Sequence, residues 1–265
     1  MSPPAASLRA EVLARLPQLA GAVWRPLAGG RTNHLWRVAG AVVKSYDPDA
    51  ASPLFPNDPV AERRALAALS PSGLAPVPLG GGTTWIAYHY LQGAAWRSGT
   101  ASVARALHRL HGHPGADFRP LGSGSAALLA QGRAILAACP ATLPEPPDPG
   151  LPPAAPCLIH GDAVPGNIIA GTQGLTLIDW QCPASGDPAE DLAMFLSPAM
   201  QWLYRGAPLT GPERDEFLAA YPDGGTVARF LVLEPLFRWR MAAHCLWKSS
   251  RGAPDYSAAL RFEIA

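Results

Sequence analysis

Two short apolar runs in the second half of the chain, Cys157–Ile159 and Leu175–Ile178, are each followed closely by an aspartate. Runs of this length next to turn residues are typical of short strands, so Asp162 and Asp179 are expected on loops that rigid elements hold in place. Asn167 lies five residues after Asp162 and twelve residues before Asp179. No other part of the sequence constrains the fold as strongly as these three side chains and their spacing.

The three residues are suited to one kind of chemistry. Transfer of a phosphoryl group requires a carboxylate near the acceptor hydroxyl and oxygen ligands for Mg²⁺, because the protein has to position the groups and neutralise charge. Asp162 is predicted to accept a hydrogen bond from the hydroxyl and orient it. Asn167 and Asp179 are predicted to supply neutral and charged oxygen ligands to the metal ion.

The residues around this motif have simpler interpretations. His160 is expected to be a neutral imidazole that braces the loop, rather than a catalytic base. Asp187 precedes Pro188-Ala189-Glu190, a pattern that predicts a helix cap followed by the first turn of a helix. Asp191 could brace the catalytic loop through His160 or through backbone amides, or it could be an ordinary acid of a first helical turn.

The first third of the chain predicts a small α+β lobe. Helices are expected over residues 7–16 and Pro59–Leu69. Turn signals at Ala28-Gly29-Gly30, Ala39-Gly40 and Gly80-Gly81-Gly82 separate the strand-like runs. These runs are Ala22–Leu27, Leu35–Val38, Ala41–Tyr46 and Thr84–Tyr90.

The rest of the chain is mainly helical in pattern. Apolar residues recur at helical spacing in Ala101–His111 and Ser125–Cys139. Residues 140–156 contain eight prolines and are expected to form an extended surface loop, unless they serve as a docking site for a partner that binds proline motifs. A further helix is expected over Thr226–Lys248, with a kink at Pro235.

Composition excludes several classes of protein. The 265 residues carry a net charge of +1, and only 15% of them are charged, which gives no electrostatic case for nucleic-acid binding. No apolar run is long enough for a membrane helix, and the N-terminus does not have the pattern of a signal peptide. The four cysteines are far apart in the sequence and favour reduced thiols in a cytoplasmic protein.

The motif as a whole resembles a known family. His160-Gly161-Asp162, Asn167, Ile178-Asp179-Trp180 and Gly186-Asp187-Pro188 are similar to the motifs of the aminoglycoside phosphotransferase, choline kinase and thiamine kinase-like family. The spacing from Asp162 to Asn167 matches the protein-kinase loop H-R-D-x-x-x-x-N, with Gly161 in place of arginine. Val164-Pro165 departs from many relatives, which have a histidine before this proline.

The resemblance implies a bilobal, protein-kinase-like α+β fold. In this interpretation residues 1–92 form an N-terminal ATP-binding lobe with an antiparallel sheet and one helix. Residues 93–265 form a larger, mainly helical lobe that carries catalysis and acceptor binding. ATP and Mg²⁺ are the implied cosubstrate and cofactor, and the acceptor is a small molecule with a hydroxyl group.

The N-terminal part supplies the implied nucleotide site. Gly29, Gly30 and Asn33 lie in a stretch similar to the family's G-G-x-x-N loop, which replaces the protein-kinase glycine loop. Lys44 is expected to contact the α- and β-phosphates and to pair with Glu62. The connector, at which the adenine ring hydrogen-bonds to backbone groups, is expected at Tyr88, His89 and Tyr90.

The acceptor is less constrained. Ten aromatic residues between positions 194 and 256 favour an amine-bearing alcohol similar to thiamine or choline, although aromatic residues at helical spacing are also typical of a core. Glu234 is the acid of interest for an aminoglycoside pocket, although Arg238 and Arg240 near it in the sequence could equally be its ion-pair partners. A catalytically silent nucleotide-binding module or a metal-dependent hydrolase could carry a similar set of residues, and the sequence leaves the oligomeric state open.

Overall fold

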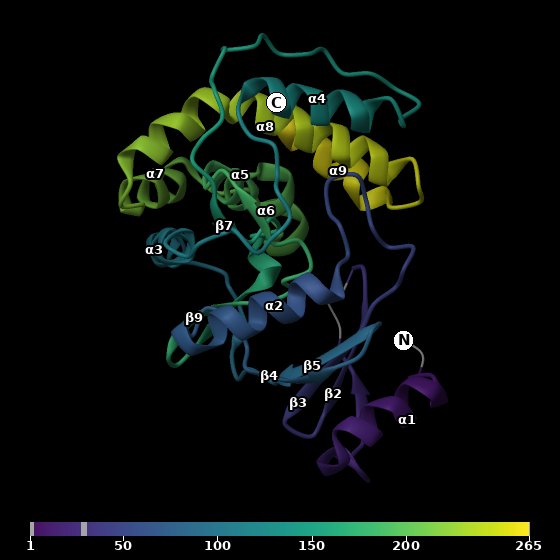
Figure 1. The fold of residues 1–265 in the computed structure, drawn as a ribbon. Helices are drawn as coiled ribbons and strands as arrows, with labels where there is room; N and C mark the ends of the chain where they lie inside the picture. Colours follow the sequence, from purple (N-terminus) through teal and green to yellow (C-terminus); the bar gives the residue numbers. More distant parts are fainter. Residues whose placement is uncertain (1–2, 28–30, 265) are drawn as a thin grey trace. The chain divides into compact units, whose positions relative to one another are not determined.

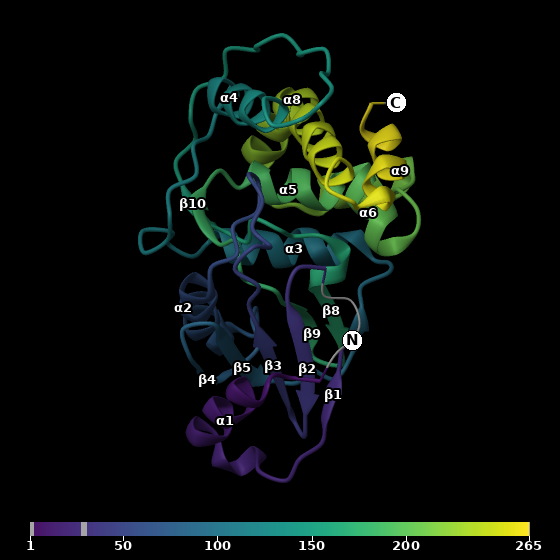
Figure 2. The same ribbon diagram turned by 90° about the vertical axis from the view of Figure 1, so that its right-hand side faces the viewer.

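The computed structural model describes residues 3–27 and 31–264, and it has the predicted α+β composition (Figures 1 and 2). The chain forms two compact units. The first unit contains residues 1–94 and 169–182, and the second contains residues 95–168 and 183–265. Residues 169–182, which include Asp179, therefore group with the N-terminal part of the chain rather than with the helical part.

The first unit is built around an antiparallel sheet with the strand order β1-β2-β3-β5-β4. Antiparallel pairing sets its register, with Trp36 opposite Val43 and Val43 opposite Ala87. The five strands are β1 (Trp24–Pro26), β2 (His34–Val38), β3 (Ala41–Ser45), β4 (Pro78–Gly81) and β5 (Trp85–His89).

Two helices cover opposite faces of this sheet (Figure 1). Helix α1 (Ala6–Arg15) and the short 3₁₀ turn Pro17–Leu19 pack their apolar residues against Trp36, Val43 and the neighbouring side chains of one face. Because side chains alternate along a strand, Lys44 faces the other side, where helix α2 (Pro59–Leu69) lies. Helix α2 begins at the predicted residue, with Asp58 Oδ1 accepting from the backbone N–H groups of Val60 and Ala61.

One predicted turn is a strand in the structure. Gly80 and Gly81 belong to β4, where they pair with Ala87 and Ile86 on β5 after a register shift. A side chain on Gly81 would come within 3.0 Å of the Trp85 carbonyl oxygen, so this irregular edge pairing favours glycine. A 3₁₀ turn, Ser70–Ser72, follows α2. A small sheet in the order β6-β8-β9 is formed by Ala94–Ala95, Ile168–Gly171 and Gly174–Leu177.

The second unit is mainly helical. Helix α3 (Thr100–His111) buries Val103, Leu107 and Leu110, the stripe that its sequence predicts. A two-stranded sheet of β7 (Cys157–Ile159) and β10 (Ala184–Gly186) precedes and follows the segment with Asp162 and Asn167, and the 3₁₀ turn Pro165–Asn167 follows β7. The remaining helices are α4 (Ser125–Leu136), α5 (Ala189–Leu196), α6 (Pro198–Arg205), α7 (Gly211–Ala220), α8 (Gly224–Ser249) and α9 (Pro254–Glu263).

The long helix α8 packs against several other helices of this unit. It runs without interruption through Pro235, and α4 lies beside it in both views (Figures 1 and 2). The proline-rich residues 140–156 contain neither helix nor strand, as predicted. Within the described part of the chain, no helix is long and apolar enough to cross a membrane.

His244 makes the stability of this unit sensitive to acid. It is buried in α8, where burial and the positive charges of Lys248 and Arg240 lower its pKa from 6.5 to about 3. The unfolded chain therefore takes up a proton below about pH 6.5 that the folded chain does not, so the free energy of unfolding falls as pH drops toward 3. At about 1.4 kcal/mol for each pH unit, we expect a loss of roughly 2 kcal/mol between pH 6.5 and pH 5.

Urea unfolding of wild type and His244→Gln at pH 7 and pH 5 tests this expectation. The variant lacks the titrating group, so its free energy of unfolding should change less with pH than that of wild type. Equal changes in the two proteins would show that His244 is not the group responsible.

Candidate functional site

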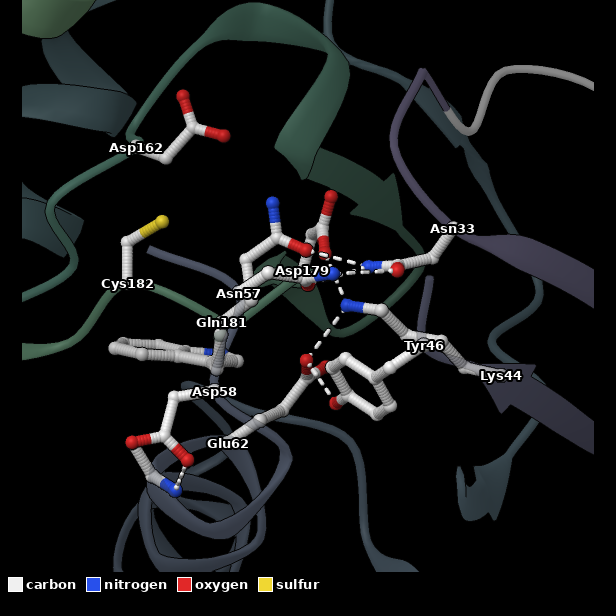
Figure 3. A network of polar contacts seen from close by, with 12 residues as sticks. Asn33, Lys44, Tyr46, Asn57, Asp58, Glu62, Asp162, Asp179, Gln181 and Cys182 are labelled. Carbon is white, nitrogen blue, oxygen red and sulfur yellow. Dashed lines mark hydrogen bonds and ion pairs between the residues drawn. The ribbon is translucent and has the colours of Figure 1, made fainter. Parts of the chain in front are cut away.

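Lys44 lies at the centre of a buried cluster of charges in the first unit (Figure 3). Its Nζ lies 2.6 Å from Oε2 of Glu62 on α2, and it also contacts Oδ1 of Asp179. The contact predicted between Lys44 and Glu62 is therefore present. Tyr46, which no pattern in the sequence singles out, donates its hydroxyl hydrogen to the same oxygen of Glu62.

The electrostatics of this cluster keep the lysine protonated. Burial disfavours a charged ammonium group, but the carboxylates of Asp179 and Glu62 outweigh this effect and raise the pKa of Lys44 above its ordinary value. The side chain of Lys44 is 1% exposed, so its charge is fixed between two carboxylates and is little screened by solvent. The cluster therefore holds a positive charge in a fixed position on the face of the sheet opposite α1.

Asp179 has an unusual backbone conformation. It follows β9 by two residues and adopts φ 64°, in the left-handed region that residues other than glycine seldom occupy. Its side chain is 29% exposed, whereas those of Lys44 and Glu62 are fully buried. A strained, partly exposed carboxylate next to a fixed cation is typical of a functional position.

The residues that were predicted to bind the nucleotide lie in different environments. Gly29 and Gly30 lie outside the described residues. The Asn33 side chain donates to the amide oxygens of Asn57 and Gln181 (Figure 3). Tyr88 is buried on β5, and burial raises its pKa. The backbone N–H groups of His89 and Tyr90 donate to the carbonyls of Val77 and Gly40, so these two amides are already used.

The loop that carries Asp162 in the second unit is braced through its backbone. The N–H groups of His160 and Gly161 donate to the two carboxylate oxygens of Asp191, at 2.8 and 2.9 Å. Gly161 has φ 76°, which allows the chain to turn sharply between His160 and Asp162. His160 is fully buried, and its Nδ1 accepts from the backbone N–H of Asp162 at 3.2 Å, as expected for a neutral, bracing imidazole.

Asp191 is in turn held from another helix. Nε2 of His111 on α3 lies 3.1 Å from Asp191, and Nδ1 of His111 lies 2.7 Å from the hydroxyl of Tyr221. Burial alone would raise the pKa of Asp191, but the bonds from His111 and the charge of that imidazole outweigh burial and lower it. Of the two interpretations of Asp191, the bracing one is confirmed, although no sequence signal identified His111 or Tyr221.

Asn167 orients Asp162. Its Nδ2 donates to the Asp162 carbonyl oxygen at 2.9 Å and to Oδ2 of Asp162 at 3.0 Å. With its nitrogen committed in this way, the other end of the amide, Oδ1, is the atom that can serve as a ligand. Asp187, predicted as a helix cap, accepts from the Ala189 N–H at 3.0 Å and also pairs with Arg229.

Comparison with known proteins assigns the chain to a family. A family model described as APH, phosphotransferase enzyme family, matches residues 23–231, which is well over half of the chain. The chain belongs to the phosphotransferase enzyme family. Its membership makes it a phosphotransferase, in agreement with the resemblance that the motif indicates. No curated protein matches the sequence significantly.

Several solved structures have a similar fold. A choline/ethanolamine kinase family protein from Mesorhizobium loti is 20% identical, with a TM-score of 0.63 over 97% of this chain and 91% of that one. Choline kinase LicA from Streptococcus pneumoniae is 18% identical, with a TM-score of 0.65 over 98% and 99% of the two chains. The streptomycin–ATP–APH(2″)-IIa ternary complex is 15% identical, with a TM-score of 0.65 over 91% of each chain. These similarities show that this family member has the protein-kinase-like fold.

The residues present suit Mg²⁺ rather than a metal that prefers nitrogen or sulfur. Asp179 offers a partly exposed carboxylate and Asn167 an amide oxygen, both of which are hard oxygen donors. Across residues 3–27 and 31–264, no group of three or more His, Cys, Asp and Glu side chains could hold a metal ion. Mg²⁺ needs only a few protein ligands when waters and phosphate oxygens complete its coordination.

Proposed function

We propose that this phosphotransferase moves the γ-phosphoryl group of Mg·ATP to a hydroxyl group of a small molecule. The observation that carries the proposal is the protonated Lys44, held between Glu62 and the partly exposed carboxylate of Asp179. A buried cation beside a metal-binding carboxylate is what the phosphates of a nucleotide require. The ATP complex among the structures of similar fold agrees with this choice of donor.

Each residue has a role in this proposal. Lys44 contacts the α- and β-phosphates, and Glu62 holds the lysine in place. Asp162 accepts a hydrogen bond from the acceptor hydroxyl and directs its oxygen toward the phosphorus, while Asn167 holds Asp162 by its carboxylate oxygen. Asp179 and Asn167 are the protein ligands of Mg²⁺, which when bound neutralises charge on the transferred group. Residues 1–92 serve mainly the nucleotide, and residues 93–265 serve catalysis and the acceptor.

Charge pairing in the second unit favours an acceptor with few positive charges. An aminoglycoside carries several ammonium groups and needs several carboxylates that are not neutralised by the protein. Glu234 pairs with Arg214 at 2.6 Å. Other acids of this unit are paired in the same way: Glu213 with Arg205, Asp187 with Arg229, and Glu190 with Arg240.

One aromatic side chain lies directly against the catalytic loop. The ring of Tyr204 on α6 packs so closely on Gly166 that a side chain at position 166 would come within 2.4 Å of it. Nearby in sequence, Trp202 packs against Phe262 with ring centroids 5.7 Å apart. Aromatic faces attract a single ammonium group. An amine-bearing alcohol similar to choline or thiamine therefore suits this unit better than a polycation.

A panel of acceptors tests the choice of substrate. ADP formation from Mg·ATP should rise with one of thiamine, choline, ethanolamine, homoserine or a fructosamine, and should stay at background with aminoglycosides. A response to aminoglycosides alone would overturn the preference for a singly charged acceptor, while leaving the proposed phosphoryl transfer intact.

A further inference from the structure

Three amide side chains of the first unit are joined by hydrogen bonds (Figure 3). Nδ2 of Asn33 donates to Oε1 of Gln181 at 2.7 Å and to Oδ1 of Asn57 at 2.9 Å. Nδ2 of Asn57 donates back to Oδ1 of Asn33 at 2.9 Å. Gln181 and Asn33 are buried, so these bonds form where an unpaired amide would be costly.

The network leaves Asn33 no capacity to bind a nucleotide through its side chain. Both N–H groups of its amide are used, and its oxygen accepts from Asn57 and from the backbone N–H of Asp47 at 3.0 Å. Asn57 in addition donates to the Asp47 carbonyl at 2.8 Å. The network thus ties the start of β2 to the loop between β3 and α2.

The segment that carries Asp179 is attached to the same loop. Asp58, the cap of α2, donates its backbone N–H to the carbonyl of Gln181 at 3.2 Å. Sγ of Cys182 donates to the Pro56 carbonyl at 3.1 Å. Residues 181 and 182 are therefore fixed by side-chain and backbone bonds to the loop that leads into α2, and α2 carries Glu62.

We propose that Gln181, Asn33 and Asn57 are positioning residues that hold Asp179 in place for Mg²⁺, an inference that rests on the proposed function. Asp179 sits in a strained left-handed conformation two residues before Gln181 and needs a fixed anchor beyond it. Gln181 provides this fixed point because its side-chain oxygen accepts a hydrogen bond from Asn33. Asn57 in turn holds the Asn33 side chain in place. The essential atom is Gln181 Oε1, since no hydrogen bond in the described part of the chain uses its Nε2.

Calorimetric binding of an ATP analogue at varied Mg²⁺ concentration tests the proposal. Gln181→Met keeps the length of the side chain but removes the acceptor, and it should raise the Mg²⁺ concentration for half-maximal binding by roughly 10–100-fold. Gln181→Glu keeps an accepting oxygen and should stay within about threefold of wild type on the same reasoning. Asn57→Asp, at a less buried position, removes both donors and should shift the requirement by about tenfold.

A matched control separates positioning from loss of stability. Gln201 is a buried glutamine of the second unit that donates to the Phe195 carbonyl. Gln201→Met should lower the melting temperature without changing the Mg²⁺ requirement. Hydrogen exchange of the metal-free protein gives a second readout, in which Gln181→Met and Asn57→Asp should lose protection in residues 46–58 and 179–182.

The outcomes separate the two proposals. Wild type that binds no nucleotide at any Mg²⁺ concentration would overturn the proposed function. Hydrogen exchange would then decide whether the amide network holds residues 179–182 in place. Wild type with normal binding, together with Gln181→Met and Asn57→Asp variants of unchanged Mg²⁺ requirement and protection, would overturn the positioning role alone. A shift in Gln181→Glu as large as that in Gln181→Met would also contradict it, because the accepting oxygen would then not matter.

Discussion

Replacing Asp162 by asparagine is expected to lower kcat by about 10²- to 10⁴-fold, equivalent to roughly 3–5 kcal/mol of transition-state stabilisation. The substitution keeps the size of the side chain and an oxygen to accept the bond from Asn167. It removes the charge that orients and accepts the hydrogen of the acceptor hydroxyl. The loop should keep its shape because Asp191 holds it through the backbone amides of His160 and Gly161.

Nucleotide affinity separates this role from a role in ATP binding. The dissociation constant for Mg·ATP should stay close to the wild-type value in Asp162→Asn, because Asp162 acts on the acceptor. Asp215→Asn, at an exposed acid of α7, is the matched control and should leave both constants unchanged. Loss of ATP binding in Asp162→Asn would show that Asp162 belongs to the nucleotide site instead.

Asp179→Asn is expected to abolish Mg²⁺-dependent ATP binding, with a loss of affinity above about 100-fold, since removing a direct metal ligand should exceed the effect of removing an outer partner. Asparagine tolerates the left-handed conformation that residue 179 adopts, so this variant tests the carboxylate and not the backbone. Asp179→Ala should bind no better and should lose a further ~1 kcal/mol of stability through strain at the same position.

Calorimetric titration of ATP with and without Mg²⁺ measures this effect. Asp49→Asn, at an exposed acid of the first unit, is the control and should bind as wild type does. Asp179→Asn that binds Mg·ATP normally would remove Asp179 from the metal site. The ion pair of Lys44 with Glu62 would then be the only part of the charged cluster with a role in nucleotide binding.

The main candidate site residues of this phosphotransferase could be picked out from the sequence because each is linked to a local pattern. Glu62 falls on the buried face of a helix whose start is marked by Asp58 and Pro59, so its pairing with Lys44 followed from the order of the elements. The strands before Asp162 and Asp179 were recognisable from their apolar runs. The roles assigned to these residues remain predictions.

Other features depend on contacts that a single sequence does not encode locally. Gly80 and Gly81 look like a turn, but pairing with β5 makes them an edge strand, because tertiary hydrogen bonds outweigh the weak strand propensity of glycine. Asn57 and Gln181 are 124 positions apart in the sequence, and both lie beside Asn33 only after folding. In the sequence, His111 likewise looks like the last residue of an amphipathic helix, and its contact with Asp191 forms only on folding.

The most direct test of the proposed phosphoryl transfer is to identify the molecule that receives the γ-phosphoryl group. ³¹P NMR of wild type with Mg·ATP and each member of the acceptor panel should show a new phosphate monoester with one acceptor, which Asp162→Asn does not produce at a comparable rate. Inorganic phosphate formed at the same rate with and without acceptors would indicate a hydrolase and contradict phosphoryl transfer. Tight ATP binding with no consumption of ATP across the panel would favour a silent nucleotide-binding module.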